Sequence, residues 1–141
     1  MSNWFRFTYY PFTSKDAGTG KIINILRPSI PIIISYKGSA SWPFQALVDS
    51  GSDRNLFPAG PARSIGIEVE NGEKIEINGI GNSKVIAYSH KVQLFIANYK
   101  FETEIDFSRD QQTPLLGREG FFNHFKKIEF KEKEKSVEFR I

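Results

Sequence analysis

The chain has 141 residues, 40% of them apolar and 25% charged, which is enough for one globular domain with a core and too few for two. It contains no cysteine, so disulfides, thiolate catalysis and cysteine-bound metal centres are excluded. The formal net charge is +3, but the lysines at 126–135 alternate with glutamates, which is typical of a solvated surface rather than of a nucleic-acid-binding stripe.

The first segment, residues 1–26, is predicted to be an N-terminal extension packed on the domain at 27–141. Side chains at 4–9 alternate in type, which favours an extended segment, and a glycine-rich turn follows at 16–20. The start of the chain lacks the charged residues and long apolar run of a signal peptide, and no apolar stretch is long enough to cross a membrane. We therefore expect a cytoplasmic protein without a membrane or nucleic-acid partner.

Short strands dominate the rest of the predicted domain. They are bounded by turn residues and cover 30–36, 43–48, 74–78, 85–87, 92–96, 101–105, 128–130 and 137–139. The intervening segments at 37–41, 79–83, 97–100 and 131–135 are predicted to be hairpin turns.

Two segments favour short helices. The first, 61–65, ends before Gly66, a residue type common just after a helix C-terminus. The second, 118–125, carries phenylalanines at helical spacing. Together with the strands, these segments predict a mostly β domain with one or two short helices, built as a closed or nearly closed barrel.

Asp49 is the acidic residue that stands out, because an apolar strand, 44–48, runs directly into it. A carboxylate at the end of a buried strand costs free energy unless it is paired or used. Ser50 and Gly51 follow, and their type allows a sharp backbone turn. The same three residue types are also common in ordinary strand-end turns, so the tripeptide alone leaves both interpretations open.

Two further motifs follow in the sequence. Residues 77–81, Ile-Asn-Gly-Ile-Gly, predict a glycine-tipped hairpin, and the absence of a following Lys-Ser/Thr argues against a phosphate-binding loop. Residues 114–118, Pro-Leu-Leu-Gly-Arg, place an apolar pair before a glycine. Each motif is weak alone, but their order and spacing after Asp49 are specific.

With these three motifs in register over about residues 27–130, the chain resembles the retropepsins, the retroviral and retroviral-like aspartic proteases. Its terminal segments resemble bacterial relatives more than viral members. The resemblance implies a retropepsin-like closed barrel (acid protease fold) with one lobe per chain. It also implies an aspartic endopeptidase that needs no cofactor and no metal ion.

The resemblance assigns roles to the loop that follows the apolar strand. Asp49 matches the catalytic aspartate, and Ser50, Gly51 and Ser52 complete the active-site loop. Ser50 replaces the more usual threonine and is expected to hold this loop against the same loop of a second subunit. Ser52 stands where alanine is usual. The flap that closes over a peptide is matched by Ile77, Asn78, Gly79, Ile80 and Gly81.

A structural ion pair is also implied by the resemblance. Asp53 matches an aspartate that binds the arginine of the Gly-Arg motif, here Arg118. Arg27 is expected to join that pair across the subunit interface.

One catalytic aspartate per chain implies two chains. Aspartic peptidases use two carboxylates that share one proton, because two like charges held close together cannot both be ionised. One carboxylate takes a proton from water while the other gives a proton to the scissile carbonyl. We therefore expect a homodimer that contributes Asp49 from each subunit and acts on a peptide or protein. The alternative is a non-catalytic retropepsin-like domain that binds peptides or mediates dimerisation.

Two other features remain open or ordinary. The last strand, 137–141, either pairs with the terminus of a second chain or completes the sheet of its own subunit. His90 and His124 have no second ligand residue at i+4, so we expect surface or packed histidines rather than metal ligands.

Overall fold

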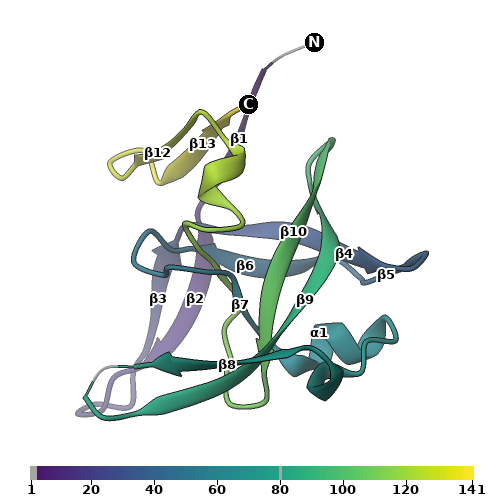
Figure 1. Ribbon diagram of the computed structural model, residues 1–141. Coiled ribbons are helices and arrows are strands. Elements are labelled where there is room, and N and C mark those ends of the chain that lie inside the picture. Colours follow the sequence, from purple (N-terminus) through teal and green to yellow (C-terminus); the bar gives the residue numbers. More distant parts are fainter. Residues whose placement is uncertain (1–2, 80) are drawn as a thin grey trace.

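The computed structural model describes residues 3–79 and 81–141 (Figure 1). In this described part of the chain, six strands close into a barrel in the order β4-β6-β11-β7-β10-β9, and β9 pairs back onto β4. These strands are β4 (Ser29–Tyr36), β6 (Phe44–Val48), β7 (Leu56–Pro58), β9 (Lys84–Ile96), β10 (Tyr99–Ser108) and β11 (Leu115–Leu116). The predicted mostly β, closed-barrel class is confirmed.

The barrel interior follows from period-two alternation, since successive side chains of a strand point to opposite faces. In β4, Ile30, Ile32 and Ile34 are each at most 1% exposed, and the residues between them face outward. Burying one such side chain fully contributes about 1.5–3 kcal/mol. Ala46 and Val48 of β6 continue the same core and lead directly to Asp49.

Two hairpins extend the barrel strands. β4 turns through Lys37 and Gly38, which both have positive φ, into β5 (Ser39–Ala40), as a tight hairpin turn requires. β8 (Glu73–Asn78) pairs with the first half of β9. The predicted strands 85–87 and 92–96 are parts of the single 13-residue strand β9. Polar residues at 89–91 interrupt its apolar pattern, but pairing with β10 continues across them.

One of the two predicted helices forms and the other does not. The helix predicted at 61–65 is confirmed as α1 (Ala59–Ser64), and Gly66 follows it with φ +85°. A single-turn 3-10 helix, η1 (Val69–Asn71), comes next. The prediction of a helix at 118–125 was wrong, because only the 3-10 turn η2 (Phe122–His124) forms there.

The reason is the backbone at Gly120, which adopts φ +100°. This value lies outside the right-handed helical region, so the segment is interrupted after its first two residues. The N–H groups of those two residues, Arg118 and Glu119, donate to the carbonyls of Ser52 and Asp53. The helices in the described ranges are too short and too polar to cross a lipid bilayer.

Both ends of the chain meet in a second sheet of order β1-β13-β12, built from β1 (Trp4–Thr8), β12 (Lys127–Lys131) and β13 (Ser136–Arg140). β13 is the middle strand, so it completes the sheet of its own subunit, one of the two interpretations left open by the sequence. Phe125 joins this sheet to the barrel: its ring centroid lies 5.2 Å from that of Phe139 in β13 and 5.6 Å from that of Tyr99 in β10.

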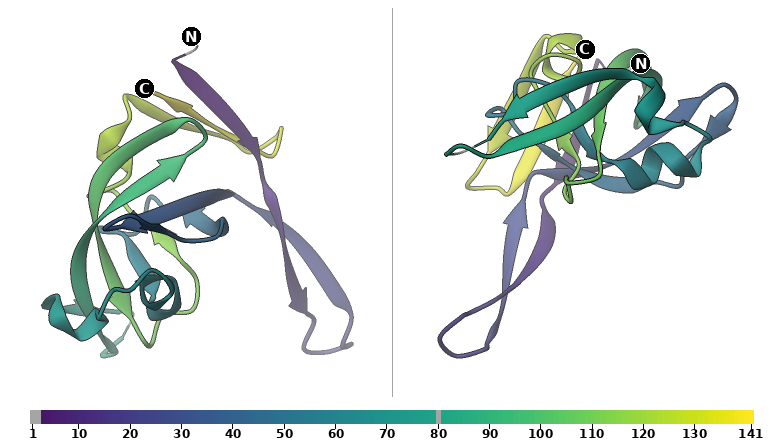
Figure 2. Two further views of the ribbon diagram at one scale, coloured as in Figure 1. Left: turned by 90° about the vertical axis from the view of Figure 1, so that its right-hand side faces the viewer. Right: turned by 60° about the horizontal axis from the view of Figure 1, so that its bottom comes forward.

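The remaining N-terminal residues form a hairpin of β2 (Tyr10–Lys15) and β3 (Ile22–Arg27) that projects from the barrel (Figure 2). Tyr9, between β1 and β2, is buried, and its hydroxyl donates to Glu132 at 2.8 Å. Burial and this hydrogen bond raise the pKa of Tyr9 to about 12. The N-terminal extension therefore contacts the domain through β1 and Tyr9, and β2–β3 extends beyond it.

Candidate active site

Asp49 begins the loop that connects β6 to β7. The short strand β11 lies between these two strands, parallel to β6 and antiparallel to β7. The loop at 49–55 therefore leaves the barrel on one side of β11 and returns on the other. The N–H of Asp49 donates to the carbonyl of Leu116 at 3.0 Å, which fixes Asp49 beside the end of β11.

The Asp49 carboxylate is oriented by its own loop. The N–H of Gly51 donates to Oδ1 at 2.9 Å, and the N–H of Ser52 donates to the Asp49 carbonyl at 3.1 Å. Asp49 is partly buried and Ser50 is exposed. Over residues 3–79 and 81–141, no hydrogen bond reaches Oδ2 of Asp49. The side chain is thus held at one oxygen and open at the other.

Asn55 ties this loop to the Gly-Arg motif. It is fully buried; its Oδ1 accepts from the N–H of Gly117 at 2.9 Å, and its Nδ2 donates to the carbonyl of Glu104 at 3.1 Å. A side chain at position 117 would overlap the backbone of Arg54, so the close approach needs glycine. Asn55 was not among the residues predicted for the site, although its place directly before an apolar strand is a sequence signal for a buried, hydrogen-bonded side chain.

The ion pair predicted between Asp53 and Arg118 does not occur within the described residues. Both residues are exposed, and the contact between their segments runs through the backbone. The N–H of Arg118 donates to the Ser52 carbonyl at 2.9 Å, and the N–H of Glu119 donates to the Asp53 carbonyl at 2.8 Å. Water solvates the two charged side chains at such positions, which removes the need for a partner.

Arg54 makes the ion pair of this loop instead. Its Nε and Nη2 donate to Oδ2 and Oδ1 of Asp106 at 2.8 and 2.9 Å, and Nη2 also reaches Glu104 at 3.3 Å. Asp106 is fully buried in β10, whereas the Arg54 side chain is 38% exposed. The hydrogen bond to Asp106 is the main cause that raises the pKa of Arg54. Neither residue was predicted to belong to the site.

The predicted flap corresponds to the β8–β9 hairpin. Its turn is closed by the N–H of Gly79, which donates to the carbonyl of Ser83 at 2.8 Å, and Gly81 takes φ +76°. The end of β8 and this turn hold the described members of the predicted flap, Ile77, Asn78, Gly79 and Gly81; Ile80 lies outside the described residues. In Figure 1 this tip, the β6–β7 loop and the β2–β3 hairpin all extend toward the left side of the view.

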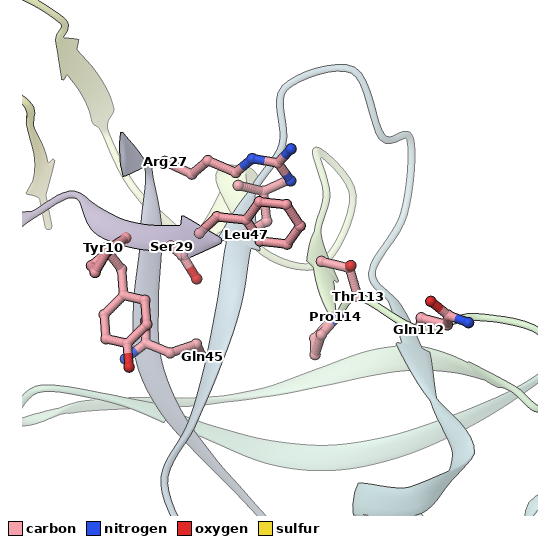
Figure 3. A pocket seen from close by; sticks show the side chains of 10 residues that line it. Tyr10, Arg27, Ser29, Gln45, Leu47, Gln112, Thr113 and Pro114 are labelled. Carbon is pink, nitrogen blue, oxygen red and sulfur yellow. The ribbon is translucent and has the colours of Figure 1, made fainter. Parts of the chain in front are cut away.

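A cavity of about 220 Å³ lies between the root of the β2–β3 hairpin and the barrel. Figure 3 shows Arg27, Leu47 and Thr113 around it. The Arg27 guanidinium lies 3.9 Å from the ring centroid of Phe12, a cation–π contact. Leu47 precedes Asp49 by two residues, so the cavity adjoins the strand that carries the carboxylate.

No protein-family model matches the sequence, and the comparison with curated proteins gave no match. Among solved structures, a retropepsin-like aspartic protease from Rickettsia conorii matches with a TM-score of 0.62 and 13% identity, over 99% of this chain and 96% of that one. The chain has the retropepsin-like fold. The EIAV protease complexed with the inhibitor HBY-793 also matches, with a TM-score of 0.51 and 21% identity, over 65% of this chain and 82% of that one.

Within this retropepsin-like barrel, the predicted site residues fall into separate groups. The loop of Asp49 and the Gly-Arg motif are brought together by backbone hydrogen bonds. The residues predicted to form a flap lie in a separate hairpin, and Arg27 lies at the root of another. Nε2 of His90 donates to the Val69 carbonyl at 2.8 Å, and burial lowers the pKa of His124, which stacks on an aromatic ring. Across the described ranges, no three acidic or histidine side chains gather as metal ligands.

Proposed function

We propose that the chain is an aspartic endopeptidase whose active site forms when two copies each contribute Asp49. The observation that supports this most directly is how the Asp49 carboxylate is held. Hydrogen bonds with Gly51 and Leu116 orient Asp49, and its Oδ2 accepts no hydrogen bond from the described residues. The retropepsin-like fold supports the same conclusion. A lone carboxylate cannot serve as both acid and base, so a twofold-related copy supplies the other.

In the proposed reaction, a water molecule lies between the two Asp49 carboxylates. The ionised carboxylate removes a proton from the water, whose oxygen attacks the scissile carbonyl carbon. The protonated carboxylate gives its proton to the carbonyl oxygen. The resulting diol breaks its C–N bond as the amine receives a proton. The β8–β9 flap lies over the extended peptide, which binds as an added strand.

The first experiment compares Asp49→Asn with the wild type on a denatured protein substrate. We expect the cleavage rate to fall by about 10²- to 10⁴-fold, the range for loss of a general acid or base, while the dimer persists. Asp110→Asn, an exposed aspartate in the β10–β11 loop, is the matched control and retains wild-type cleavage. Cleavage that persists in Asp49→Asn rejects the assignment.

A mixing experiment tests the shared site directly. If each active site needs two Asp49 residues, a wild-type subunit paired with an Asp49→Asn subunit is inactive. Random exchange between equal amounts of the two proteins then lowers the activity per wild-type chain to about half, because half of the wild-type subunits are in mixed dimers. An unchanged activity means that one chain suffices. A wild type that binds peptides without cleaving them supports the non-catalytic alternative.

A further inference from the structure

The β2–β3 hairpin exposes a row of large apolar side chains on one of its faces. Strand pairing places Phe12 opposite Ile25. Tyr10 lies two residues before Phe12, and Ile23 lies two residues before Ile25, so both are on the same face. Each of these four side chains is 42–50% exposed. At about 200 Å² per large side chain, the exposed apolar area is on the order of 350 Å², which is in the range of the largest apolar patch of a typical monomer, and such patches are often functional.

The opposite face of the hairpin differs in composition. It carries three apolar residues, Pro11, Ile22 and Leu26, and three polar ones, Thr13, Lys15 and Asn24. The first face has four apolar side chains and two polar ones, Ser14 and Arg27. A two-stranded hairpin is marginally stable alone in water, so a projecting one with a mainly apolar face is expected to pack against another surface.

The position of the apolar face relates it to Asp49. Phe12 belongs to this face, lies under the Arg27 guanidinium and lines the cavity next to Leu47. The hairpin continues through Pro28, whose carbonyl accepts from the N–H of Val48 at 2.9 Å. The hairpin is therefore fixed to the strand that ends in Asp49, and it projects on the side toward which the Asp49 loop turns (Figure 1).

We infer that the β2–β3 hairpin is a dimerisation arm that packs Tyr10, Phe12, Ile23 and Ile25 against a second copy of this chain beside the shared active site. This inference rests on the proposed function, because the Asp49 dyad requires a second copy on this side. Two arms related by a twofold axis would cover on the order of 700 Å², a substantial part of a standard interface of about 1,600 Å².

The test is sedimentation velocity over a range of protein concentrations. Ile23→Glu/Ile25→Glu places two charges on the proposed contact face, and Ile22→Glu/Leu26→Glu places the same two charges on the other face of the same strand. We expect the first pair to raise the dimer Kd at least tenfold and the second to leave it within about twofold. Equal effects of the two pairs, or a wild type that stays monomeric, overturn the inference.

A second measurement avoids disruptive charges. Because the chain contains no cysteine, Ile25→Cys and Ile22→Cys each provide a single thiol. The thiol at position 25 should react about tenfold more slowly above the dimer Kd than below it, whereas the thiol at position 22 should react at one rate. A position-25 thiol whose rate does not depend on concentration overturns the inference.

Peptide cleavage separates this inference from the proposed activity. If the wild type dimerises but cleaves nothing, and Ile23→Glu/Ile25→Glu no longer dimerises, the arm is supported and the protease is rejected. Wild-type cleavage together with an unchanged Kd in that variant supports the protease and rejects the arm.

Discussion

Replacement of Arg54 by methionine should destabilise the chain far more than loss of an ordinary surface ion pair. The variant leaves the Asp106 carboxylate fully buried and removes both hydrogen bonds that it accepts from Arg54. Removing one partner of a buried pair costs about 3–5 kcal/mol. Since the Arg54 side chain is 38% exposed, water partly replaces it, and we expect a loss of about 3 kcal/mol, at the lower end of that range.

Urea unfolding followed by far-UV circular dichroism measures this loss. With a slope of about 2 kcal/mol per molar, the midpoint should fall by about 1.5 M. Protein concentration is varied, so that dissociation of a dimer is separated from unfolding.

Two further variants sharpen the comparison. Arg63→Met breaks the exposed Arg63–Glu70 pair, whose atoms lie 3.6 Å apart, and should cost at most about 1 kcal/mol. Arg54→Met/Asp106→Leu removes both buried partners and should recover most of the lost stability. If Arg54→Met and Arg63→Met shift the midpoint equally, the reasoning about the buried carboxylate is refuted.

Gly117→Ala should lower the free energy of unfolding by about 1–3 kcal/mol, because its methyl group overlaps the Arg54 backbone; Gly60→Ala, with open space around the position in α1, should be neutral or stabilising in the same urea assay. The hydrogen bond from Lys131 lowers the pKa of the buried Glu138 below its usual value near 4.5. This ion pair therefore stabilises the fold above that value and is lost as the pH falls through the lower folded pKa. Urea midpoints measured from pH 6 to pH 3 should fall less steeply in Glu138→Gln than in the wild type, and parallel curves would contradict the pairing.

Local pattern was sufficient to predict most strands and the closed barrel, and distant contacts explain the failures. An apolar run followed by turn residues predicted a strand at 30–36, and β4 (Ser29–Tyr36) forms there. The segment 118–125 has helical phenylalanine spacing, but Gly120 within it adopts φ +100° and interrupts it. Gly120 also lies against Asn55 and Thr103, and the sequence of the segment does not show those distant contacts.

In the candidate site, too, short motifs were predicted more successfully than contacts between distant residues. Of the three short motifs, two are brought together: backbone hydrogen bonds join the loop of Asp49 to the Gly-Arg motif, whereas the third motif lies in the separate β8–β9 hairpin. The predicted Asp53–Arg118 ion pair does not form within the described residues, and a different pair, Arg54 with Asp106, holds this loop. Asp106 is 52 residues from Arg54, and its burial depends on β10 pairing with β7 and β9. A single sequence does not contain that register.

The Asp49 loop is held entirely by bonds within one subunit, and this bears on how the proposed site assembles. Leu116, Gly117 and Arg118 hold the loop through their backbone groups, all from the same subunit. A second copy would then supply a carboxylate to a loop that is already formed. The free-energy cost of assembling the active site would then be the loss of translational and rotational freedom of two subunits and the ordering of side chains at the interface. Refolding of the loop would not add to it. The free energy available for that association must come from elsewhere on the surface, and the exposed apolar face of the β2–β3 hairpin is positioned to provide part of it.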